Sequence, residues 1–161
     1  MKALTIWQPW ASLIVAGAKP FEFRSWMAPR SVTGKEIVIH AGARKMVGSE
    51  IDRLIYALER GGNFAAMVAL HKDQAMPVLE AAKSGNLPLS SGIGTATIGV
   101  SRDGMEIART EFGLDHVNDS DRNQHANWGW PMLDPKKWTD PIPMSGKQGL
   151  WNWPEPQDLG L

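Results

Sequence analysis

Four side chains that can do chemistry lie within eight residues of each other: Lys19, Glu22, Arg24 and Trp26. Side chains alternate between the two faces of a β-strand, so Glu22, Arg24 and Trp26 share one face of a strand predicted over 21–26. A carboxylate, two cations and an aromatic ring can together bind phosphate, stack on a base and move a proton. Glu22 and Arg24 can equally form a simple ion pair on a solvated surface. The pattern marks a candidate site and leaves its use open.

His40 is a further candidate, on a second strand predicted over 36–41. Ile37 and Ile39 share one face of this strand, while Val38 and His40 share the other. Imidazole exchanges a proton near neutral pH, so His40 can serve as a fifth member of the site. It can also be a half-buried histidine whose hydrogen bonds are satisfied within the protein.

The chain has eight Trp but only four Phe and one Tyr. Trp7, Trp10 and Trp26 lie near the start, and the other five follow residue 127. This distribution predicts that the two ends of the chain pack together. Some of the rings can also line a cleft in which a nucleobase stacks.

The amino-acid composition excludes several classes of protein. The 161 residues suit one domain, 1–161, and 43% apolar residues exclude disorder as the main state. Seventeen basic residues balance seventeen acidic ones, which argues against a polybasic binder. Without cysteine there are no disulfides and no thiolate chemistry, and the four histidines lack metal-ligand spacing. We therefore expect no metal, no cofactor and no membrane association. The start of the chain lacks a signal-peptide pattern, so we expect a cytoplasmic protein.

Local patterns predict the elements that must position these residues. Pro9 and Gly17 bracket a short helix, Ser49 resembles the first residue of a capping box, and Pro77 is expected to break a helical stretch. The segment 105–112 fits either a strand or a helix. The predicted strands span 3–6, 21–26, 36–41, 92–100, 128–133 and 149–153, the helical segments 49–60 and 64–84, and the longest loop 113–127. Strands at both ends with helices between them predict an α+β fold, with a small barrel closed by the terminal strands.

Several motifs in this order resemble the ASCH domain, a PUA-like family named after activating signal cointegrator homology. Gly94-Thr95-Ala96 fits the central strand of that family. The other matching segments are Trp7-Gln8-Pro9-Trp10-Ala11-Ser12-Leu13-Ile14, Gly17-Ala18-Lys19, Glu22-x-Arg24-x-Trp26, Ile39-His40-Ala41 and Pro141-Ile142-Pro143-x-x-Gly146-Lys147-Gln148-Gly149-Leu150-Trp151.

The resemblance implies a PUA-like small mixed β-barrel with flanking helices and a cleft that faces RNA or a modified nucleobase. In small amidohydrolases of the family, a Lys two residues after the motif glycine acts with a Thr three residues later. Lys19 matches that Lys, but Glu22 stands in place of the Thr, which argues against a threonine mechanism. The candidate catalytic residues are Lys19, Glu22, Arg24 and His40, and the candidate nucleic-acid contacts are Trp7, Gln8, Ser12, Trp26, Lys147 and Gln148.

Four functions remain open. The first is binding of single-stranded RNA, and the second is metal-independent cleavage of that RNA, with Glu22 or His40 as the base. The third is hydrolysis or reading of a modified nucleoside such as 4-acetylcytidine, with Glu22 activating water and Lys19 polarising the acyl carbonyl. The fourth is a non-catalytic interaction domain. The sequence leaves the oligomeric state open.

Overall fold

The computed structural model describes residues 1–118 and 127–160 of the chain. Its strands are β1 (Lys2–Ile6), β2 (Phe21–Arg24), β3 (Glu36–Ala41), β4 (Ser91–Ile98), β5 (Arg102–Asp103), β6 (Trp128–Pro143) and β7 (Leu150–Asn152). Its helices are α1 (Trp10–Val15), α2 (Gly48–Arg60), α3 (Gly62–Met67), α4 (Lys72–Lys83), α5 (Gly104–Glu111) and a short 3₁₀ helix, η2 (Pro156–Leu159).

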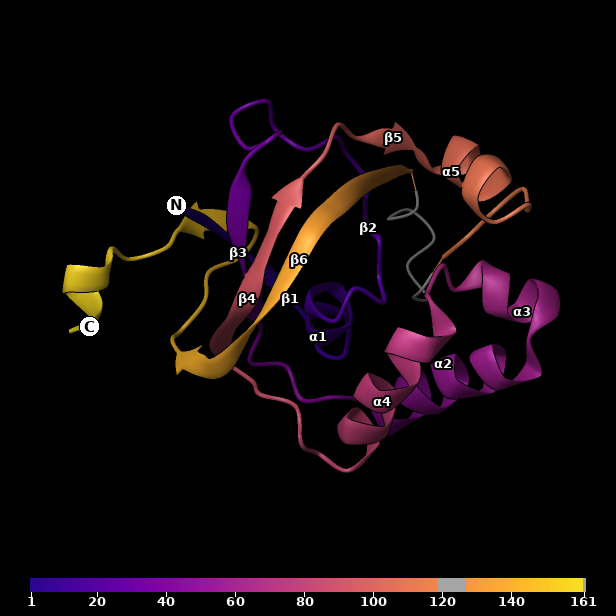
Figure 1. Ribbon diagram of the computed structural model, residues 1–161, viewed down its shortest axis with the longest axis horizontal. Coiled ribbons are helices and arrows are strands. Elements are labelled where there is room, and N and C mark those ends of the chain that lie inside the picture. Colours follow the sequence, from indigo (N-terminus) through magenta and orange to yellow (C-terminus); the bar gives the residue numbers. More distant parts are fainter. Residues whose placement is uncertain (119–126, 161) are drawn as a thin grey trace.

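The strands form one mixed sheet in the order β2-β6-β4-β3-β1-β7, with β5 paired to β6. The pairing of β1 with β3 is parallel, whereas β1–β7, β3–β4, β4–β6 and β2–β6 are antiparallel. The sheet curls into a half-barrel with α1 inside the curl (Figure 1). The predicted α+β class is therefore confirmed, and β1 and β7 bring the two chain ends together as expected. Among the described residues β2 and β7 are the two edges of the sheet, so the terminal strands do not close it into the predicted barrel.

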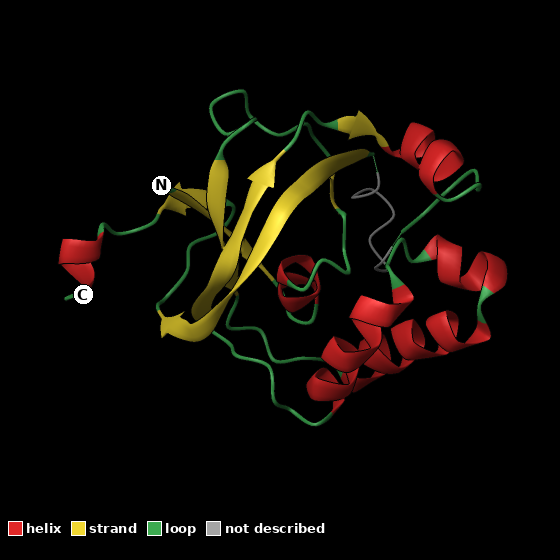
Figure 2. Cartoon of the chain, viewed as in Figure 1, coloured by secondary structure: helices red, strands yellow, loops and turns green. Residues whose placement is uncertain are grey.

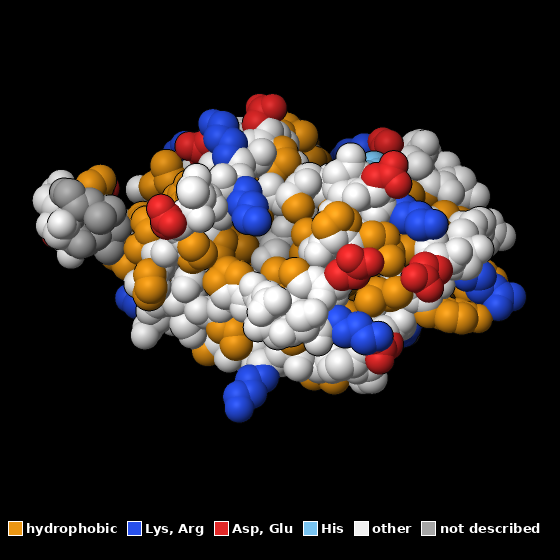
Figure 3. All heavy atoms as spheres, turned by 60° about the horizontal axis from the view of Figure 1, so that its bottom comes forward, with side chains coloured by type: hydrophobic (Ala, Val, Ile, Leu, Met, Phe, Trp, Pro, Cys, Tyr) orange, Lys and Arg blue, Asp and Glu red, His pale blue; other side chains and the backbone are white. Residues whose placement is uncertain are grey.

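Helices α2, α3 and α4 lie together on one side of the curled sheet, and α5 lies near the start of β6 (Figure 2). Helix α2 buries Ile51, Leu54 and Leu58, which share one face of the helix, in the main core. On the face of the molecule shown in Figure 3, acidic and basic side chains are interspersed rather than gathered by sign. This face offers no polybasic surface.

Three local predictions are wrong. Helix α4 continues through Pro77, and the chain instead turns between α3 and α4, where Ala69 has a φ of 54°. Val47 rather than a capping side chain precedes α2, so Ser49 lies inside the helix. Strand β2 ends at Arg24 instead of Trp26.

Strand β6 is much longer than predicted, and two of its prolines, Pro135 and Pro141, coincide with irregular pairing. The register between β4 and β6 shifts twice, and Asp134 next to Pro135 has a φ of 46°. A proline cannot donate a ladder hydrogen bond, so it is tolerated where a bulge interrupts the ladder. The ambiguous segment 105–112 is helical, as α5, and Asp103 caps it. Of the predicted loop 113–127, residues 119–126 lie outside the described part of the chain.

Candidate functional site

Lys19 is held in the protein interior by the turn that ends α1. Gly17 has a φ of 75°, a conformation that favours glycine and closes the helix as predicted. The backbone N–H groups of Ala18 and Lys19 both donate to the Leu13 carbonyl, and His71 N–H donates to the Ala18 carbonyl. The turn is therefore fixed from two sides, and Lys19 is only 1% exposed.

Strand β2 separates its side chains as the alternation predicted. Phe21 and Phe23 pack into a small apolar cluster with Ile107. Glu22 is opposite Trp130 in the antiparallel pairing of β2 with β6, and Trp130 belongs to the main core. Glu22 is therefore almost fully buried beside a large aromatic side chain.

Glu22 lies between two cations. Lys19 Nζ is 3.7 Å from Glu22 Oε1, and Arg24 Nη2 is 3.5 Å from Glu22 Oε2. Both separations exceed the 2.7–2.9 Å typical of a charge-assisted hydrogen bond, so these contacts are loose ion pairs. Burial makes each charge costly unless it is compensated, and the alternation of charges supplies that compensation. The structure thus brings together Lys19, Glu22 and Arg24, which the sequence placed in one site.

Trp130 contacts Arg24 and holds the backbone that follows β2. Its indole Nε1–H donates to the Trp26 carbonyl at 2.9 Å, and the Arg24 guanidinium lies 5.7 Å from the centre of its ring. Trp26 itself is 62% exposed. The Trp26 backbone is therefore fixed while its ring remains available to stack on a ligand.

His40 does not join this cluster, contrary to prediction. It is buried in a separate group of side chains around Trp151, whose ring meets the imidazole edge-on at 5.4 Å between ring centres. Its Nε2 lies 2.7 Å from the Met144 carbonyl, which can only accept, so Nε2 carries the proton. Nδ1 then accepts from the Thr5 hydroxyl, which accepts in turn from Trp151 Nε1–H. Burial lowers the pKa of His40, and its neutral form satisfies both of these hydrogen bonds.

Gln8 and Ser12 are also used inside the protein. Gln8 Nε2 donates to Ser12 Oγ at 2.7 Å and to the Pro88 carbonyl at 2.9 Å. Gln8 Oε1 accepts from the Ser12 backbone N–H at 3.0 Å. Both residues are buried, and their polar groups fix α1 against the loop before β4.

The remaining predicted contacts lie at the surface of the protein. Trp7 is partly exposed and packs against the Arg44 guanidinium at 4.1 Å from the ring centre, while Arg44 pairs with Glu50. Lys147 and Gln148 are exposed in the connection from β6 to β7. This connection leads into β7, whereas Lys19 directly precedes β2, and β7 and β2 stand at opposite ends of the strand order.

Residues 1–118 and 127–160 contain no group of three or more potential metal ligands of the His, Cys, Asp or Glu type. Within the same residues, no helix has the length and hydrophobicity needed to cross a bilayer.

Comparison with known proteins identifies the family. The sequence profile of the ASCH domain matches residues 4–95. The chain belongs to the ASCH domain family. The matched segment contains Lys19, Glu22, Arg24 and His40, whereas β6 and β7 lie beyond it. No curated protein matches the sequence.

Solved ASCH structures share the fold of the whole chain. The ASCH protein from Zymomonas mobilis is 15% identical, with a TM-score of 0.51 over 99% of this chain and 90% of that one. A serine-to-alanine mutant of that protein is 15% identical over 99% and 91% of the two chains, again with a TM-score of 0.51. A tyrosine-to-phenylalanine mutant of it is 16% identical over 99% and 93%, with the same TM-score. The predicted PUA-like ASCH fold is thereby confirmed.

Two residues of this ASCH site were not predicted as part of it. Trp130 was noted only as one of the C-terminal tryptophans, because its place beside Glu22 depends on the register between β2 and β6. Phe23 was assigned to the opposite face, yet Lys19 Nζ lies 5.2 Å from the centre of its ring. Lys19 precedes the strand, so strand alternation gave no signal for this contact.

Proposed function

We propose that this ASCH domain binds single-stranded RNA at Lys19, Glu22 and Arg24 and cleaves it without a metal ion. The observation that carries the proposal is the Glu22 carboxylate between two cations, at 3.7 Å and 3.5 Å. A carboxylate beside a guanidinium provides both a proton acceptor and a partner for phosphate. The PUA-like fold of the family, generally associated with RNA binding, supports the same substrate class.

RNA supplies its own nucleophile, so the protein needs only to move protons and stabilise charge. Glu22 accepts the proton of the 2′-hydroxyl, and the 2′ oxygen attacks the adjacent phosphorus. Arg24 stabilises the negative charge that builds on the phosphate oxygens. As the bond from phosphorus to the 5′ oxygen breaks, Lys19 donates a proton to that oxygen. The products are a 2′,3′-cyclic phosphate and a 5′-hydroxyl, and proton exchange with water restores Glu22 and Lys19.

The loose ion pairs favour this use of Glu22. A carboxylate held by short, bidentate hydrogen bonds would have to break them before it could accept a proton. At 3.5–3.7 Å, neither oxygen of Glu22 is closely held by these two cations. The exposed ring of Trp26, beyond Arg24 in the sequence, supplies a surface on which an unpaired base can stack.

A second candidate is hydrolysis of an acylated nucleoside such as 4-acetylcytidine. The burial of Lys19 favours it, because a small acyl group reaches an interior ammonium more readily than a phosphate within a polymer does. In this reaction Glu22 activates a water molecule and Lys19 polarises the acyl carbonyl.

One experiment separates these activities. Purified protein in EDTA is incubated with a single-stranded RNA that contains 4-acetylcytidine, and the products are identified by liquid chromatography and mass spectrometry. Shortened fragments ending in a cyclic phosphate support the ribonuclease. Intact RNA that has lost the acetyl group supports the amidohydrolase. Unchanged RNA that also fails to bind contradicts both and leaves a non-catalytic interaction domain.

Variants link the products to the site and exclude contaminating nucleases. Glu22→Gln and Lys19→Ala should abolish turnover, and circular dichroism should confirm that each variant is folded. Arg24→Gln should also lower turnover. Arg109→Gln is its matched control, because Arg109 is exposed on α5 and pairs with exposed Asp115, at 3.7 Å. A 2′-deoxy nucleotide at the cleaved position should prevent cleavage, and cutting that persists there would rule out the 2′-hydroxyl mechanism.

A further inference from the structure

The chain that leaves β2 carries exposed apolar side chains in a firmly held segment. Trp26 is 62% exposed and Met27 is 49% exposed. The segment is anchored at both ends, because Trp130 Nε1–H donates to the Trp26 carbonyl and the Ala28 backbone N–H donates to Ser101 Oγ at 2.8 Å. The exposure of these side chains therefore belongs to an ordered surface.

Two further apolar side chains extend this surface. Val100 is 71% exposed and adjoins Ser101, which anchors Ala28. Leu133 is 48% exposed, and its Cδ1 lies 3.3 Å from where a Cβ on Gly99 would stand. We call Trp26, Met27, Val100 and Leu133 the apolar strip. Grouped apolar exposure of this kind marks a binding surface more often than scattered exposed residues do.

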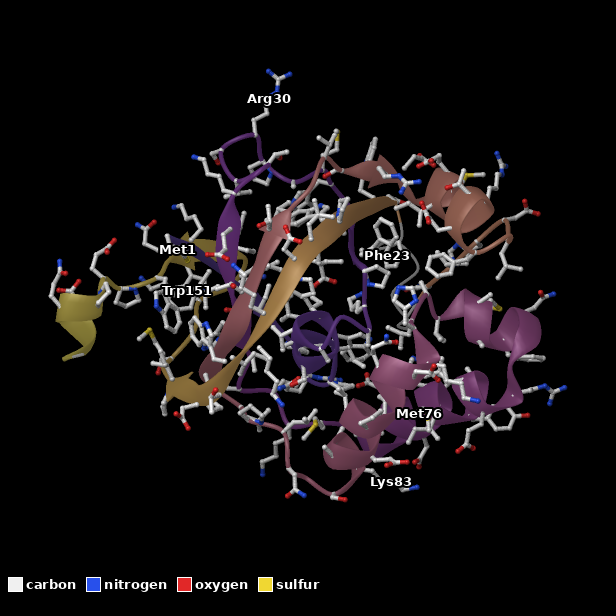
Figure 4. The ribbon with its side chains drawn as sticks, viewed as in Figure 1. Met1, Phe23, Arg30, Met76, Lys83 and Trp151 are labelled. Atoms are coloured by element: carbon white, nitrogen blue, oxygen red, sulfur yellow. The ribbon has the colours of Figure 1, made fainter. Side chains whose placement is uncertain are left out.

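Positive charge flanks the apolar strip on the side of β2. Arg24 precedes it, and Arg30 follows it in the turn after β2. Within the described part of the chain no carboxylate lies within ion-pair distance of Arg30, and its side chain points away from the body of the protein (Figure 4). Fully extended, the six residues from Ser25 to Arg30 would span at most about 20 Å, a length that covers several nucleotides of a single strand.

Negatively charged side chains border the apolar strip on the side of α5. Arg102 is neutralised there by Glu106 at 2.7 Å and Glu111 at 2.8 Å, and Asp103 caps the helix. Carboxylates thus outnumber guanidinium groups beside β5. This arrangement of charges disfavours a phosphate on that side relative to the side of Arg30.

We infer that the apolar strip and Arg30 bind the nucleotides that flank the one held at Lys19, Glu22 and Arg24. This inference rests on the proposed RNA-binding function and deepens it: the ligand is a single strand of several consecutive unpaired nucleotides. Their bases stack on Trp26 and pack against Met27 and Val100, and a phosphate pairs with Arg30. A base-paired duplex hides the faces of its bases and cannot use this surface.

The test compares ligands of two lengths. Fluorescence anisotropy measures the binding of a labelled dinucleotide and a labelled octanucleotide, both with 2′-O-methyl riboses so that neither is cleaved. The wild-type protein should bind the octanucleotide at least about fivefold more tightly, as expected when one further base stacks. Arg30→Gln and Val100→Ser should remove much of this gain while leaving dinucleotide binding unchanged. For Arg30→Gln, the slope of log affinity against log salt should become shallower by about 0.7.

The controls separate this inference from the proposed function. Arg30 and Val100 are exposed, so their variants should fold, and Arg109→Gln removes an arginine from outside the strip. Two results would refute binding of flanking nucleotides at the apolar strip while leaving RNA binding at Glu22 intact. The first is an equal affinity of the wild-type protein for the two ligands, and the second is an octanucleotide affinity that is unchanged in both variants. In that case the apolar strip is better explained as a protein-docking surface. If the wild-type protein binds neither ligand, the proposed function and the strip both fail.

Discussion

Acidification should destabilise this protein through His40, whose neutral form is required by its hydrogen bonds. His40 Nε2–H donates to the Met144 carbonyl, and Nδ1 accepts from the Thr5 hydroxyl. A proton on Nδ1 would remove that acceptor and place a charge in a site that is 1% exposed. In the described part of the chain the side chains of Thr5 and Trp151 interact with the ring, and neither carries a charge to compensate it.

The sign and size of the effect follow from linkage. Burial lowers the pKa of His40 in the folded protein below its ordinary value of 6.5, which applies to the unfolded chain. Above pH 6.5 both states are neutral and the full stability is present. Below pH 6.5 the unfolded chain takes up the proton first, so the free energy of unfolding falls as the pH falls. The loss reaches at most about 1.4 kcal/mol per pH unit and ends at the folded-state pKa.

Urea unfolding at pH 7.5, 6.5 and 5.5, followed by tryptophan fluorescence, measures this loss. His40→Gln is the matched variant, because its amide can donate through Nε2 and accept through Oε1 but does not titrate. The other three histidines are common to both proteins and cancel in the comparison. The wild-type protein should lose stability more steeply than the variant below pH 6.5. Equal losses in both proteins would refute the assignment of His40 as a buried neutral residue.

Three further substitutions test other contacts. Gly146→Ala should cost about 1–3 kcal/mol of unfolding free energy, because a Cβ there would overlap the His40 ring; an unchanged urea midpoint would contradict this. Gln8→Leu should lower the free energy of unfolding by roughly 2–4 kcal/mol, because it leaves Ser12 and the Pro88 carbonyl without hydrogen-bond partners. The RNA affinity of the folded variant should stay unchanged. A loss of affinity without a loss of stability would show that Gln8 contacts the RNA. Trp130→Phe should lower the free energy of unfolding by about 1–3 kcal/mol and also weaken RNA binding, because it removes the hydrogen bond to the Trp26 carbonyl. A variant with wild-type stability and wild-type affinity would show that this hydrogen bond is dispensable.

Local sequence signals were sufficient wherever an element depends on its own residues. Gly17 ends α1 because glycine readily adopts a φ of 75°, and that turn fixes Lys19. The alternation of apolar and polar residues separates Phe21 and Phe23 from Glu22 within β2. The same signals failed at Pro77, which lies inside α4, and along β6, where Pro135 and Pro141 coincide with register shifts that the sequence alone did not indicate.

The sequence by itself determined the family, the α+β class and the proximity of Lys19, Glu22 and Arg24, since neighbours along one turn and strand remain neighbours after folding. The tertiary structure alone decided which polar residues face inward. His40 follows a strong strand pattern, but its side chain meets Thr5 and Trp151, and β1 and β7 come from opposite ends of the chain. Trp130 reaches Glu22, and Ser101 reaches Ala28, across separations that only strand pairing and loop closure can bridge. The register of distant strands depends on packing of the whole core, so spacing along the chain could not predict these partners.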